Sequence, residues 1–548
     1  MKLPWRPGYD LTLDKIIKSA LQYNPEGEIV YRTRAAIERY NYSTAFKRMN
    51  SLAAALSSLG VREGDRVATL DWNTHWHYET YFAVPMMGAV LHTVNVRLAP
   101  YEVEYIMNHA EDKVAIVHAD FLKLVEYAAP RVKSLEHVIV VDADSAPEKL
   151  GNAKVHLYED LIKSYRESYE WPELSENTVA AMCYTSGTTG LPKGAYYTHR
   201  QMVIHALSTG LFISSSPLIG LNSAATVLHI VPMFHAFAWS LPYVTTLIGV
   251  KQVYPNRLIP SVLLELIAGE KVTHTAGVPT ILYMLLTDPS SVKYDLRGLK
   301  FLNGGSAIPE GLAELARRRG IEVIVGYGLT ETGPVLTLAS PPAKLLTSPE
   351  LGKLTLRTGW PIFLVELRVV DSEGKPMPRD GRTMGEIVAR SPWLISEYYK
   401  DPAKTEELWR GGWLNTGDIA VWFEDGSILI MDRAKDMIKS GGEWISSVRL
   451  EDAISTHPGI AQVAVIAAKS RKWGERPAAF IVPKPEWKGK ITLDEIRRHL
   501  EENYVAKGLI PRWWLPDKVV EVESLPLTSV GKIAKRVLRE QYKDLEVD

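Results

Sequence analysis

The strongest chemical signal in this 548-residue sequence is a short run rich in glycine and hydroxyl side chains, Tyr184–Gly194 (YTSGTTGLPKG). Glycines let backbone N–H groups approach an anion, hydroxyls donate to phosphate oxygens, and Lys193 adds a positive charge. A Walker A loop would need Gly-Lys-[Ser/Thr], whereas Lys193 follows Pro192 and precedes another glycine. We therefore predict a phosphate-binding loop of a different type, placed after an apolar strand.

A second motif, Gly326–Gly333 (GYGLTETG), places an aromatic ring between two glycines and a carboxylate shortly after it. Tyr327 can lie flat against a purine, and Thr330 can hydrogen-bond to phosphate. Glu331 is a hard oxygen ligand, suited to a Mg²⁺ ion shared with phosphates. The Gly-rich turn Asn303–Pro309 is a weak signal by itself. Together these features favour an ATP site.

Further charged residues follow turns in the last quarter of the chain, in the segments Trp413–Asp418, Asp432–Trp444 and Pro526–Ile533. Asp418 could accept hydrogen bonds from both ribose hydroxyls, and Arg433 could contact ribose or an α-phosphate. From spacing alone, a turn aspartate is an equal alternative for Asp418. Gly441 and Gly442 supply backbone freedom between the charged positions.

In this order, the motifs resemble those of the acyl-adenylate-forming superfamily, which includes acyl-CoA synthetases, firefly-type luciferases and peptide-synthetase adenylation domains. The resemblance extends nearly end to end and is greatest to AMP-forming medium- and long-chain fatty acyl-CoA synthetases of the thermophilic bacterial type. It implies ATP, Mg²⁺ and coenzyme A. It also implies a two-step reaction, in which an acid attacks the α-phosphate to give acyl-AMP and pyrophosphate, and the CoA thiol then displaces AMP.

The resemblance also implies a role for individual positions. Lys532, His235 and Lys193 would be catalytic, Glu331 and Thr185 would bind the metal, and Asp432 would be the hinge of a mobile C-terminal domain. Lys439 and Trp444 would lie near coenzyme A, with a surface lysine and a packed tryptophan as alternatives. The residues expected to bind ATP or coenzyme A are Thr185, Ser186, Gly187, Thr188, Thr189, Gly190, Gly305, Ser306, Ala307, Gly326, Tyr327, Gly328, Thr330, Asp418, Arg433, Lys439 and Trp444.

The acid site is expected around the segment Pro232–Trp239 (PMFHAFAW). By resemblance, His235 lines this site and Trp239 gates an acyl tunnel, while packing in the core is the alternative for both. Acetate-specific relatives have a tryptophan where this chain has Gly328, which implies a pocket open to longer acids. We predict an aliphatic acid of short, medium or long chain, hydroxylated acids included, with an aryl acid as the alternative.

Two other functions remain open at this point. A luciferase-type adenylating oxygenase shares the same motifs. A non-catalytic relative that binds nucleotide or acyl groups is an alternative from another class. The complete set of Lys193, Glu331, Asp418, Arg433 and Lys532 argues against the non-catalytic alternative.

The composition sets broad limits on the environment of these residues. Charged residues make up 23% of the chain and the formal net charge is −1, which argues against a general nucleic-acid binder. The single cysteine, Cys183, lies in an apolar run that predicts a core strand, and its isolation fits a reducing, cytoplasmic location. Gln201–Val250 carries no Asp, Glu, Lys or Arg, but its histidines and prolines favour core and pocket walls over a membrane span. No secretion signal is expected.

Apolar runs that alternate with helical patterns predict an α/β fold with mainly parallel sheets. Thr44–Leu59 has helical spacing, with Ser43 as the expected cap. A large N-terminal domain, residues 1–431, is predicted to include a β-rich subdomain at about 350–431. A small, mobile α+β domain, residues 432–548, is predicted to follow, with a helix that starts at Leu493 after the cap Thr492. The resemblance also suggests a homodimer.

Overall fold

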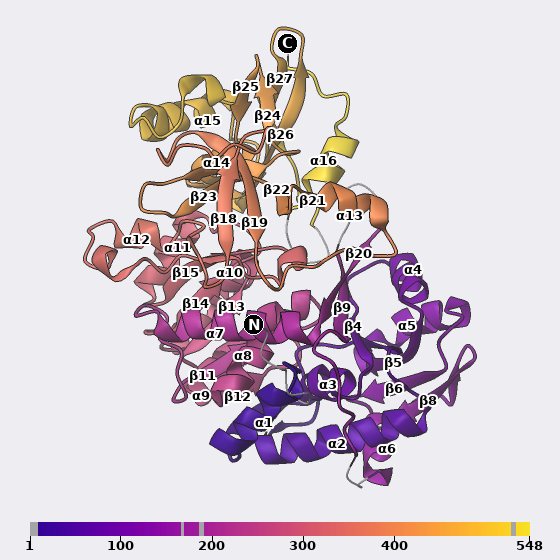
Figure 1. The fold of residues 1–548 in the computed structure, drawn as a ribbon. Helices are drawn as coiled ribbons and strands as arrows, with labels where there is room; N and C mark the ends of the chain where they lie inside the picture. Colours follow the sequence, from indigo (N-terminus) through magenta and orange to yellow (C-terminus); the bar gives the residue numbers. More distant parts are fainter. Residues whose placement is uncertain (1–8, 166–168, 186–190, 528–532, 548) are drawn as a thin grey trace, which may run out of the picture.

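The computed structural model describes residues 9–165, 169–185, 191–527 and 533–547, and their strands form four sheets (Figure 1). In the first, sheet I, the order is β17 (Trp360–Pro361), β16 (Thr337–Leu338), β15 (Glu322–Tyr327), β14 (Lys300–Asn303), β13 (His274–Gly277), β11 (Thr226–His229), β12 (Lys251–Tyr254), β1 (Glu28–Arg32) and β2 (Ile37–Asn41). In sheet II, the order is β20 (Tyr398–Tyr399), β10 (Lys193–Thr198), β9 (Val179–Thr185), β4 (Val90–Thr93), β3 (Arg66–Leu70), β5 (Asp112–His118), β6 (His137–Val141), β8 (Ala153–Leu157) and β7 (Lys149–Leu150).

Both large sheets are parallel at the centre and antiparallel at the edges. The strands from β15 to β1 in sheet I and from β9 to β8 in sheet II run parallel. Strands covered on both faces are expected to be apolar throughout, and the buried run Val114–Val117 in β5 has this pattern. The predicted α/β class with mainly parallel sheets is confirmed.

Two smaller sheets follow along the chain. The third contains β18 (Glu366–Val370), β19 (Met384–Arg390), β22 (Trp413–Trp422), β21 (Trp409–Arg410) and β23 (Ile428–Arg433). The fourth contains β25 (Glu443–Ile445), β24 (Ile438–Ser440), β27 (Gly474–Pro483), β26 (Ile460–Ser470) and β28 (Lys518–Glu521). The third sheet ends at Arg433 and the fourth begins at Ile438, close to the predicted domain boundary at Asp432. The division into two domains at that residue stays a prediction.

The α-helices within the described residues cover these sheets. They are α1 (Asp14–Tyr23), α2 (Tyr42–Ser58), α3 (His75–Met86), α4 (Pro100–Ala110), α5 (Leu122–Ala128), α6 (Tyr158–Ser164), α7 (His199–Ser215), α8 (Leu241–Ile248), α9 (Pro260–Gly269), α10 (Pro279–Thr287), α11 (Glu310–Arg318), α12 (Leu351–Leu354), α13 (Pro402–Leu408), α14 (Ser447–Ser455), α15 (Leu493–Leu500) and α16 (Lys535–Gln541).

The helices α3 and α8 join the two large sheets at the centre of the molecule. Every residue of α3 is buried, and the helix packs on β4 and β9 of sheet II. The helix α8 packs on β11 of sheet I, and the rings of Tyr81 in α3 and Tyr243 in α8 stack with their centroids 5.4 Å apart. A helix buried on all sides carries no amphipathic pattern, because no face of it meets water.

Local predictions were largely correct, with one error at a helix cap. The predicted helix Thr44–Leu59 corresponds to α2, but its cap is Asn41, whose side chain accepts a hydrogen bond from the backbone N–H of Thr44 at 2.8 Å, not Ser43. Strand β2 ends at Asn41, so the chain turns two residues earlier than the apolar spacing indicated. The cap of α15 is Thr492, as predicted, bonded to the N–H of Glu495.

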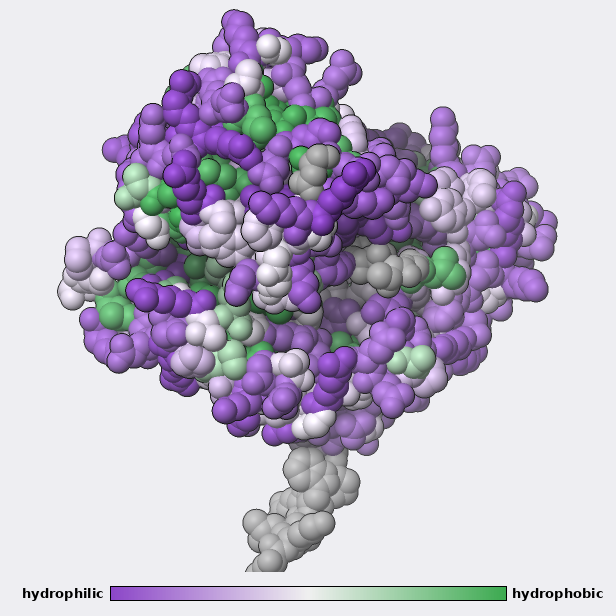
Figure 2. Space-filling model, turned by 90° about the horizontal axis from the view of Figure 1, so that it is seen from above, coloured by the Kyte–Doolittle hydropathy of each residue, from purple (hydrophilic) through white to green (hydrophobic). Residues whose placement is uncertain are grey.

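The C-terminal elements lie at the top of Figure 1, with the third sheet between them and the two large sheets. Figure 2 views the molecule from this end and shows a mainly hydrophilic surface, with smaller hydrophobic areas in between. Within the described residues, no helix is long and apolar enough to cross a membrane. The uncharged stretch Gln201–Val250 instead forms α7, β11 and α8.

Candidate active site

The first group of predicted site residues meets where β15 approaches the hairpin of β22 and β23. Asp418 and Arg433 are partners in that antiparallel pair, and their side chains form an ion pair with an Nε–Oδ1 distance of 3.0 Å. Tyr327, at the end of β15, donates its hydroxyl to the other oxygen of Asp418 at 2.8 Å. Asp418 is buried, so a carboxylate is held in a fixed orientation by an aromatic ring and a guanidinium.

A second group surrounds Glu331, which follows Tyr327 by four residues in the chain. Tyr398 of β20 donates its hydroxyl to Glu331 Oε1 at 2.6 Å, and the Lys193 ammonium lies 4.1 Å from the centroid of the Tyr398 ring. The hydroxyl of Tyr197 donates to the backbone carbonyl of Thr330. The Tyr398 side chain is therefore contacted by an anion, Glu331, at its hydroxyl and by a cation, Lys193, at its ring.

Strand pairing at the edge of sheet II explains this arrangement. Strand β10 pairs with β9 so that Lys193 lies opposite Thr185, and with β20 so that Ala195 lies opposite Tyr398. The hydroxyl of Thr185 is buried and has no hydrogen-bond partner among the described residues. A buried hydroxyl without a partner is costly, which suits a ligand that supplies one. Five residues of the predicted loop, Ser186, Gly187, Thr188, Thr189 and Gly190, lie outside the described residues.

Electrostatic effects connect the two groups. Burial opposes the charge of Arg433, but Asp418 and Glu331 together raise the pKa of its guanidinium above the ordinary value. The pKa of Tyr327 is raised well above its usual range, first by burial and then by Asp418. Burial, reinforced by Glu331, also raises the pKa of Cys183, so this thiol stays protonated and inert, as the core interpretation predicted.

The segment that follows His235 adopts an unusual backbone. Ala236, Phe237, Ala238, Trp239 and Ser240 all have positive φ angles, between 44° and 61°, and form a left-handed helical turn. For residues with a Cβ atom this conformation costs about 1–2 kcal/mol each, so the surrounding structure must hold it. We call Ala236–Ser240 the left-handed turn.

The left-handed turn brings Trp239 against the Gly-rich turn after β14. A Cβ atom built on Gly304 would lie 2.7 Å from the Trp239 ring, so only glycine permits this contact. Asn303 donates from Nδ2 to the carbonyl of Ser306 at 3.1 Å and closes the turn, while Gly305, Ser306 and Ala307 are exposed. The predicted gate residue and the predicted adenine-side turn are therefore in direct contact.

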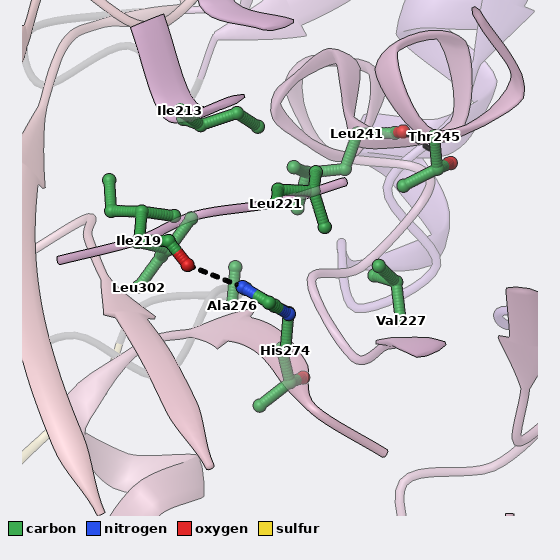
Figure 3. Close-up of a pocket in the computed structure, with 10 residues that line it drawn as sticks. Ile213, Ile219, Leu221, Val227, Leu241, Thr245, His274, Ala276 and Leu302 are labelled. Carbon is green, nitrogen blue, oxygen red and sulfur yellow. Dashed lines mark hydrogen bonds between the residues drawn. The ribbon is translucent and has the colours of Figure 1, made fainter. Parts of the chain in front are cut away.

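A small cavity of about 10 Å³ lies beside α8, the helix that follows the left-handed turn in the chain (Figure 3). Its polar side chains have partners in the protein. Thr245 donates to Leu241 O at 2.7 Å, His274 Nε2 donates to Ile219 O at 2.7 Å, and Thr275 donates to Leu228 O at 2.7 Å. The wall of the cavity is therefore apolar, and a molecule bound there would contact mainly carbon atoms. The lining residues are Ile213, Ile219, Leu221, Val227, Leu241, Thr245, His274, Thr275, Ala276 and Leu302.

The structure gives Gly328 a different role from the predicted one. A Cβ atom on Gly328 would lie 1.3 Å from the carbonyl oxygen of Pro334, so the position faces backbone and not open space. Any side chain here would require the segment from Gly328 to Pro334 to move. The absence of a side chain at Gly328 therefore gives no direct measure of pocket length in this structure. Gly326 likewise lies close to Leu338 on the neighbouring strand.

The predicted CoA residues lie apart from the nucleotide groups. Lys439 of β24 and Trp444 of β25 are register partners, with the ammonium 5.7 Å from the indole centroid. Trp444 is 42% exposed, and the backbone N–H of Lys439 donates to Glu475 at 2.8 Å. Lys532 lies outside the described residues. Its flanks are held together by a bridge between Leu527 and Ile533.

Asp432 binds the first turn of α14 with its side chain. Its Oδ2 accepts hydrogen bonds from the N–H of Ser447 at 2.7 Å and from the N–H of Val448 at 3.3 Å. Lys535, close behind Lys532 in sequence, donates to the Ser447 hydroxyl at 2.6 Å and pairs with Glu451 at 2.8 Å. The predicted hinge residue is thus bound to the C-terminal side, while the next residue, Arg433, is bound to Asp418.

Tyr398 is the site residue that sequence analysis missed. It carries no motif, and it reaches Glu331 only because β20 pairs with the far edge of β10. A tyrosine doublet after an irregular segment gives no signal of this kind in the sequence. Only the register between two distant strands places it.

Comparisons with known proteins agree with this architecture. Residues 18–399 match the family model described as AMP-binding enzyme, and residues 449–532 match the AMP-binding enzyme C-terminal domain. A long-chain-fatty-acid–CoA ligase of Thermus thermophilus is 45% identical over 541 residues, covering 98% of this chain and 96% of the relative. A medium-chain-fatty-acid–CoA ligase of Ectopseudomonas oleovorans is 38% identical over 545 residues, covering 98% and 96%.

Solved structures share the fold over nearly the whole length. The anthranilate CoA ligase AuaEII in complex with anthranoyl-AMP aligns with a TM-score of 0.84 at 25% identity, covering 98% of each chain. ATP-bound MatB from Rhodopseudomonas palustris aligns with a TM-score of 0.81 at 24% identity and supports the fold alone.

These matches define the class as AMP-binding enzymes that also carry the C-terminal domain of that family. The chain belongs to the AMP-binding enzyme family. The predicted resemblance to fatty acyl-CoA synthetases of the thermophilic bacterial type is confirmed by these relatives.

Proposed function

We propose that this protein is an AMP-forming acid:CoA ligase that activates aliphatic carboxylic acids. One observation carries the proposal. Tyr327 and Arg433 both bond to Asp418, Glu331 and Lys193 both contact Tyr398, and Glu331 helps to raise the pKa of Arg433, which connects the two groups. These are the groups that an adenosine, its ribose and a polyphosphate require. Because the chain also spans 96% of a fatty acid–CoA ligase at 45% identity, the same reaction class is the best assignment.

The chemistry follows from the charges. In the first step, a carboxylate oxygen attacks the α-phosphorus of ATP, the bond to the β-phosphate oxygen breaks, and pyrophosphate leaves. In the second step, the sulfur of coenzyme A attacks the acyl carbon, its proton is lost, and AMP leaves. The first step brings two anions together, and Lys193 and Lys532 would offset their repulsion in a site of low dielectric constant.

A Mg²⁺ ion fits the donors present. Within the described residues, no cluster of three or more His, Cys, Asp or Glu side chains could hold a metal by itself. Mg²⁺ is usually bound by one or two protein oxygens with phosphates and water. Glu331 has one oxygen bonded to Tyr398, and the Thr185 hydroxyl is buried with no described partner, so both can contribute. When bound, the ion would neutralise charge on the phosphates.

The acid is best assigned as one with an apolar tail. The cavity beside α8 has no polar side chain without a partner that could meet a hydroxyl or a charge. Its present volume of about 10 Å³ has room for about one water molecule, so a tail must displace side chains of the wall. Trp239, which precedes α8 and packs on Gly304, is the side chain whose movement we propose would admit it.

The test of the proposal is acid-dependent exchange of labelled pyrophosphate into ATP, followed by detection of CoA thioesters with a panel of acids. We expect exchange with aliphatic acids and weaker exchange with aryl acids. Light emission with a luciferin and O₂ would instead support the oxygenase alternative. Absence of exchange with every acid, in folded protein that binds ATP, would support the non-catalytic alternative and overturn the proposal.

Lys532→Ala is the sharpest single change within that test. We expect adenylation to fall by roughly 10²–10³-fold, the scale for loss of one preorganised charge contact. Thioester formation from supplied acyl-AMP should suffer much less, because the α-phosphate has already been attacked. Lys543→Ala, which lies after α16 and outside the motifs, is the control. Equal loss of both half-reactions would contradict the role assigned to Lys532.

We further propose that the C-terminal residues 432–548 rotate about Asp432 between the two half-reactions. Lys439 and Trp444 belong to the fourth sheet, whereas Asp418 belongs to the third, and this placement on the C-terminal side supports the proposal. Asp432→Pro should slow thioester formation more than adenylation. Asp432→Ala removes the same carboxylate and leaves the backbone free, so it separates the loss of the α14 cap from the loss of rotation. If both variants behave alike, Asp432 caps α14 and is not a hinge.

The remaining predictions about the environment concern location and assembly. A cytoplasmic location fits the single buried cysteine. A homodimer rests on resemblance alone, and sedimentation of the purified protein would test it. Both stay predictions.

A further inference from the structure

The left-handed turn requires an external support, and the structure identifies side chains that contact both of its flanks. Five successive residues with positive φ angles do not hold themselves in place, because each has a more favourable right-handed conformation. Backbone hydrogen bonds at the turn run from the Ala238 N–H to His235 O at 3.1 Å and from the Leu241 N–H to Ala238 O. Such local bonds do not remove the cost of five positive φ angles, so contacts from elsewhere in the chain must also hold the turn.

On the N-terminal flank, the support is Asn73, which is 1% exposed and lies just after β3 of sheet II. Its Nδ2 donates to the carbonyls of His229 at 2.8 Å and Val231 at 2.7 Å. Its Oδ1 accepts from the N–H of Met233 at 3.1 Å. A single carboxamide thus satisfies three backbone groups on the segment that leads into His235. Only an asparagine offers two donors and an acceptor with this reach.

On the C-terminal flank, the support is His205 of α7. Its Nδ1 lies 2.8 Å from the hydroxyl of Ser240, the last residue of the turn. Its Nε2 accepts from the N–H of Val335 at 3.2 Å, so the proton resides on Nδ1, which donates to Ser240. Ser240 in turn donates to the carbonyl of Gly333 at 3.4 Å. His205 therefore ties the turn to the segment that carries Glu331.

From this geometry we infer that Asn73 and His205 are positioning residues that hold the left-handed turn at its two ends and thereby set Trp239 against Gly304. The inference rests on the proposed function and concerns how the acid site is maintained. Neither residue contacts the nucleotide groups. Loss of either support allows the turn to relax toward ordinary backbone conformations and displaces Trp239, so the acid site changes while the ATP site does not.

The experiment compares Asn73→Ala with a matched control, Asn256→Gly. Asn256 is a buried asparagine that bridges to Asn73 through its backbone, but its side chain donates to Asp142. Glycine suits its φ of 66°.

The readout is pyrophosphate exchange with the KM for acid and the KM for ATP measured separately. We expect Asn73→Ala to raise the acid KM roughly tenfold, as for loss of one or more net hydrogen bonds, and to leave the ATP KM within about twofold. Asn256→Gly should leave both KM values unchanged.

A double variant tests whether the effect passes through the turn. In a Trp239→Ala background, Asn73→Ala should add little to the change in acid KM, because the side chain it positions is already absent. Full additivity would overturn the inference. Ser240→Ala is a milder second variant, since it removes the His205 partner and keeps the same backbone. It should raise the acid KM in the same direction, and an equal rise in the ATP KM would overturn the inference.

The two proposals fail differently. If the unmodified protein shows no acid-dependent exchange, the proposed function is wrong. If it shows exchange but Asn73→Ala and Ser240→Ala change the acid and ATP KM values equally, or not at all, the positioning inference alone is wrong.

Discussion

The two sides of the candidate active site are held in place by different means. On the nucleotide side, the predicted residues bind one another. Tyr327 and Arg433 both bond to Asp418, and Arg433 is also the register partner of Asp418 in the pair of β22 and β23. On the acid side, Trp239 lies in a left-handed turn that is held from outside, by Asn73 on one flank and His205 on the other.

This difference shows which contacts the motif residues make with one another and which contacts must come from other parts of the fold. The nucleotide side needs only correct strand pairing, after which its charged residues are partners for each other. The acid side keeps a conformation that its own residues disfavour, at the expense of buried polar side chains far away in the chain. A strained segment of this kind has alternative conformations close in energy, which suits a site that must admit substrates of different length.

The largest expected effect concerns the nucleotide side. Glu331→Gln keeps the hydrogen bond from Tyr398 and removes the charge. We expect pyrophosphate exchange to fall by roughly 10²–10³-fold with little change in the acid KM, because the lost group stabilises charge on the phosphates. Measuring exchange over a range of Mg²⁺ and acid concentrations would check both parts.

Glu397 provides a matched control for the Glu331→Gln substitution. Glu397 accepts a hydrogen bond from Tyr196, as Glu331 does from Tyr398, but it belongs to an exposed pair. Glu397→Gln should leave exchange within about twofold, as expected for an exposed polar contact. A comparable loss in both variants would mean that general electrostatics, and not a specific phosphate or metal contact, governs the effect.

The next effect concerns the acid side. Trp239→Ala removes the ring that packs on Gly304. We expect the preference between a long and a short aliphatic acid to change by roughly tenfold, since a few methylene groups gained or lost in an apolar site are worth this much. The ATP KM should stay the same. The ratio of kcat/KM values for two saturated acids is the measurement.

Trp409→Phe offers the control for that experiment. Trp409 is also a partly buried tryptophan of the large domain, but it lies on β21, in the third sheet. Its replacement should not change the acid preference. Equal shifts from both tryptophans would show that the preference responds to general loosening of the domain, and the contrast between the two sides of the site would be lost.

The same contrast explains how much could be predicted from the sequence. Tyr327, Glu331, Asp418 and Arg433 were predicted because residue type, spacing and family resemblance all indicate the same chemistry, and their roles stay predictions. Parallel strands such as β5 were evident because strands covered on both faces are apolar throughout. The cap of α2 was misplaced because Asn41 and Ser43 are both good caps, and only the end of β2 decides between them.

Other features had no sequence signal. Asn73 bonds to backbone groups more than 150 residues away, and backbone groups are the same at every position of a sequence. Tyr398 depends on the register of β20 against β10. The left-handed turn consists of residues that ordinarily avoid positive φ angles, so their local preferences predict a different backbone conformation. Each of these features is set by tertiary structure, and each lies at the site.

The last expected effect is a pH dependence of stability to which His205 contributes. Burial lowers the pKa of this histidine from its ordinary 6.5 to about 3, and among the described residues its direct contacts, Ser240, Thr209, Val335 and Trp393, carry no charge. The unfolded chain therefore binds a proton that the folded protein does not. The stability contributed by neutral His205 is complete above about pH 6.5 and is lost as the pH falls toward 3, at about 1.4 kcal/mol per pH unit.

His205→Gln removes this dependence and can keep one hydrogen bond. The difference in free energy of unfolding between the original protein and the variant should therefore shrink as the pH is lowered from 7 to 5, which urea unfolding of the large domain would measure. Buried His229 supplies an internal comparison, because its pKa is also lowered to about 3 by burial, yet it does not bond to the left-handed turn. His229→Gln should reduce the pH dependence of stability by a similar amount and leave the acid KM unchanged, whereas His205→Gln should alter both. If the two variants cannot be told apart by their acid KM values, His205 supports the fold but not the acid side of the site.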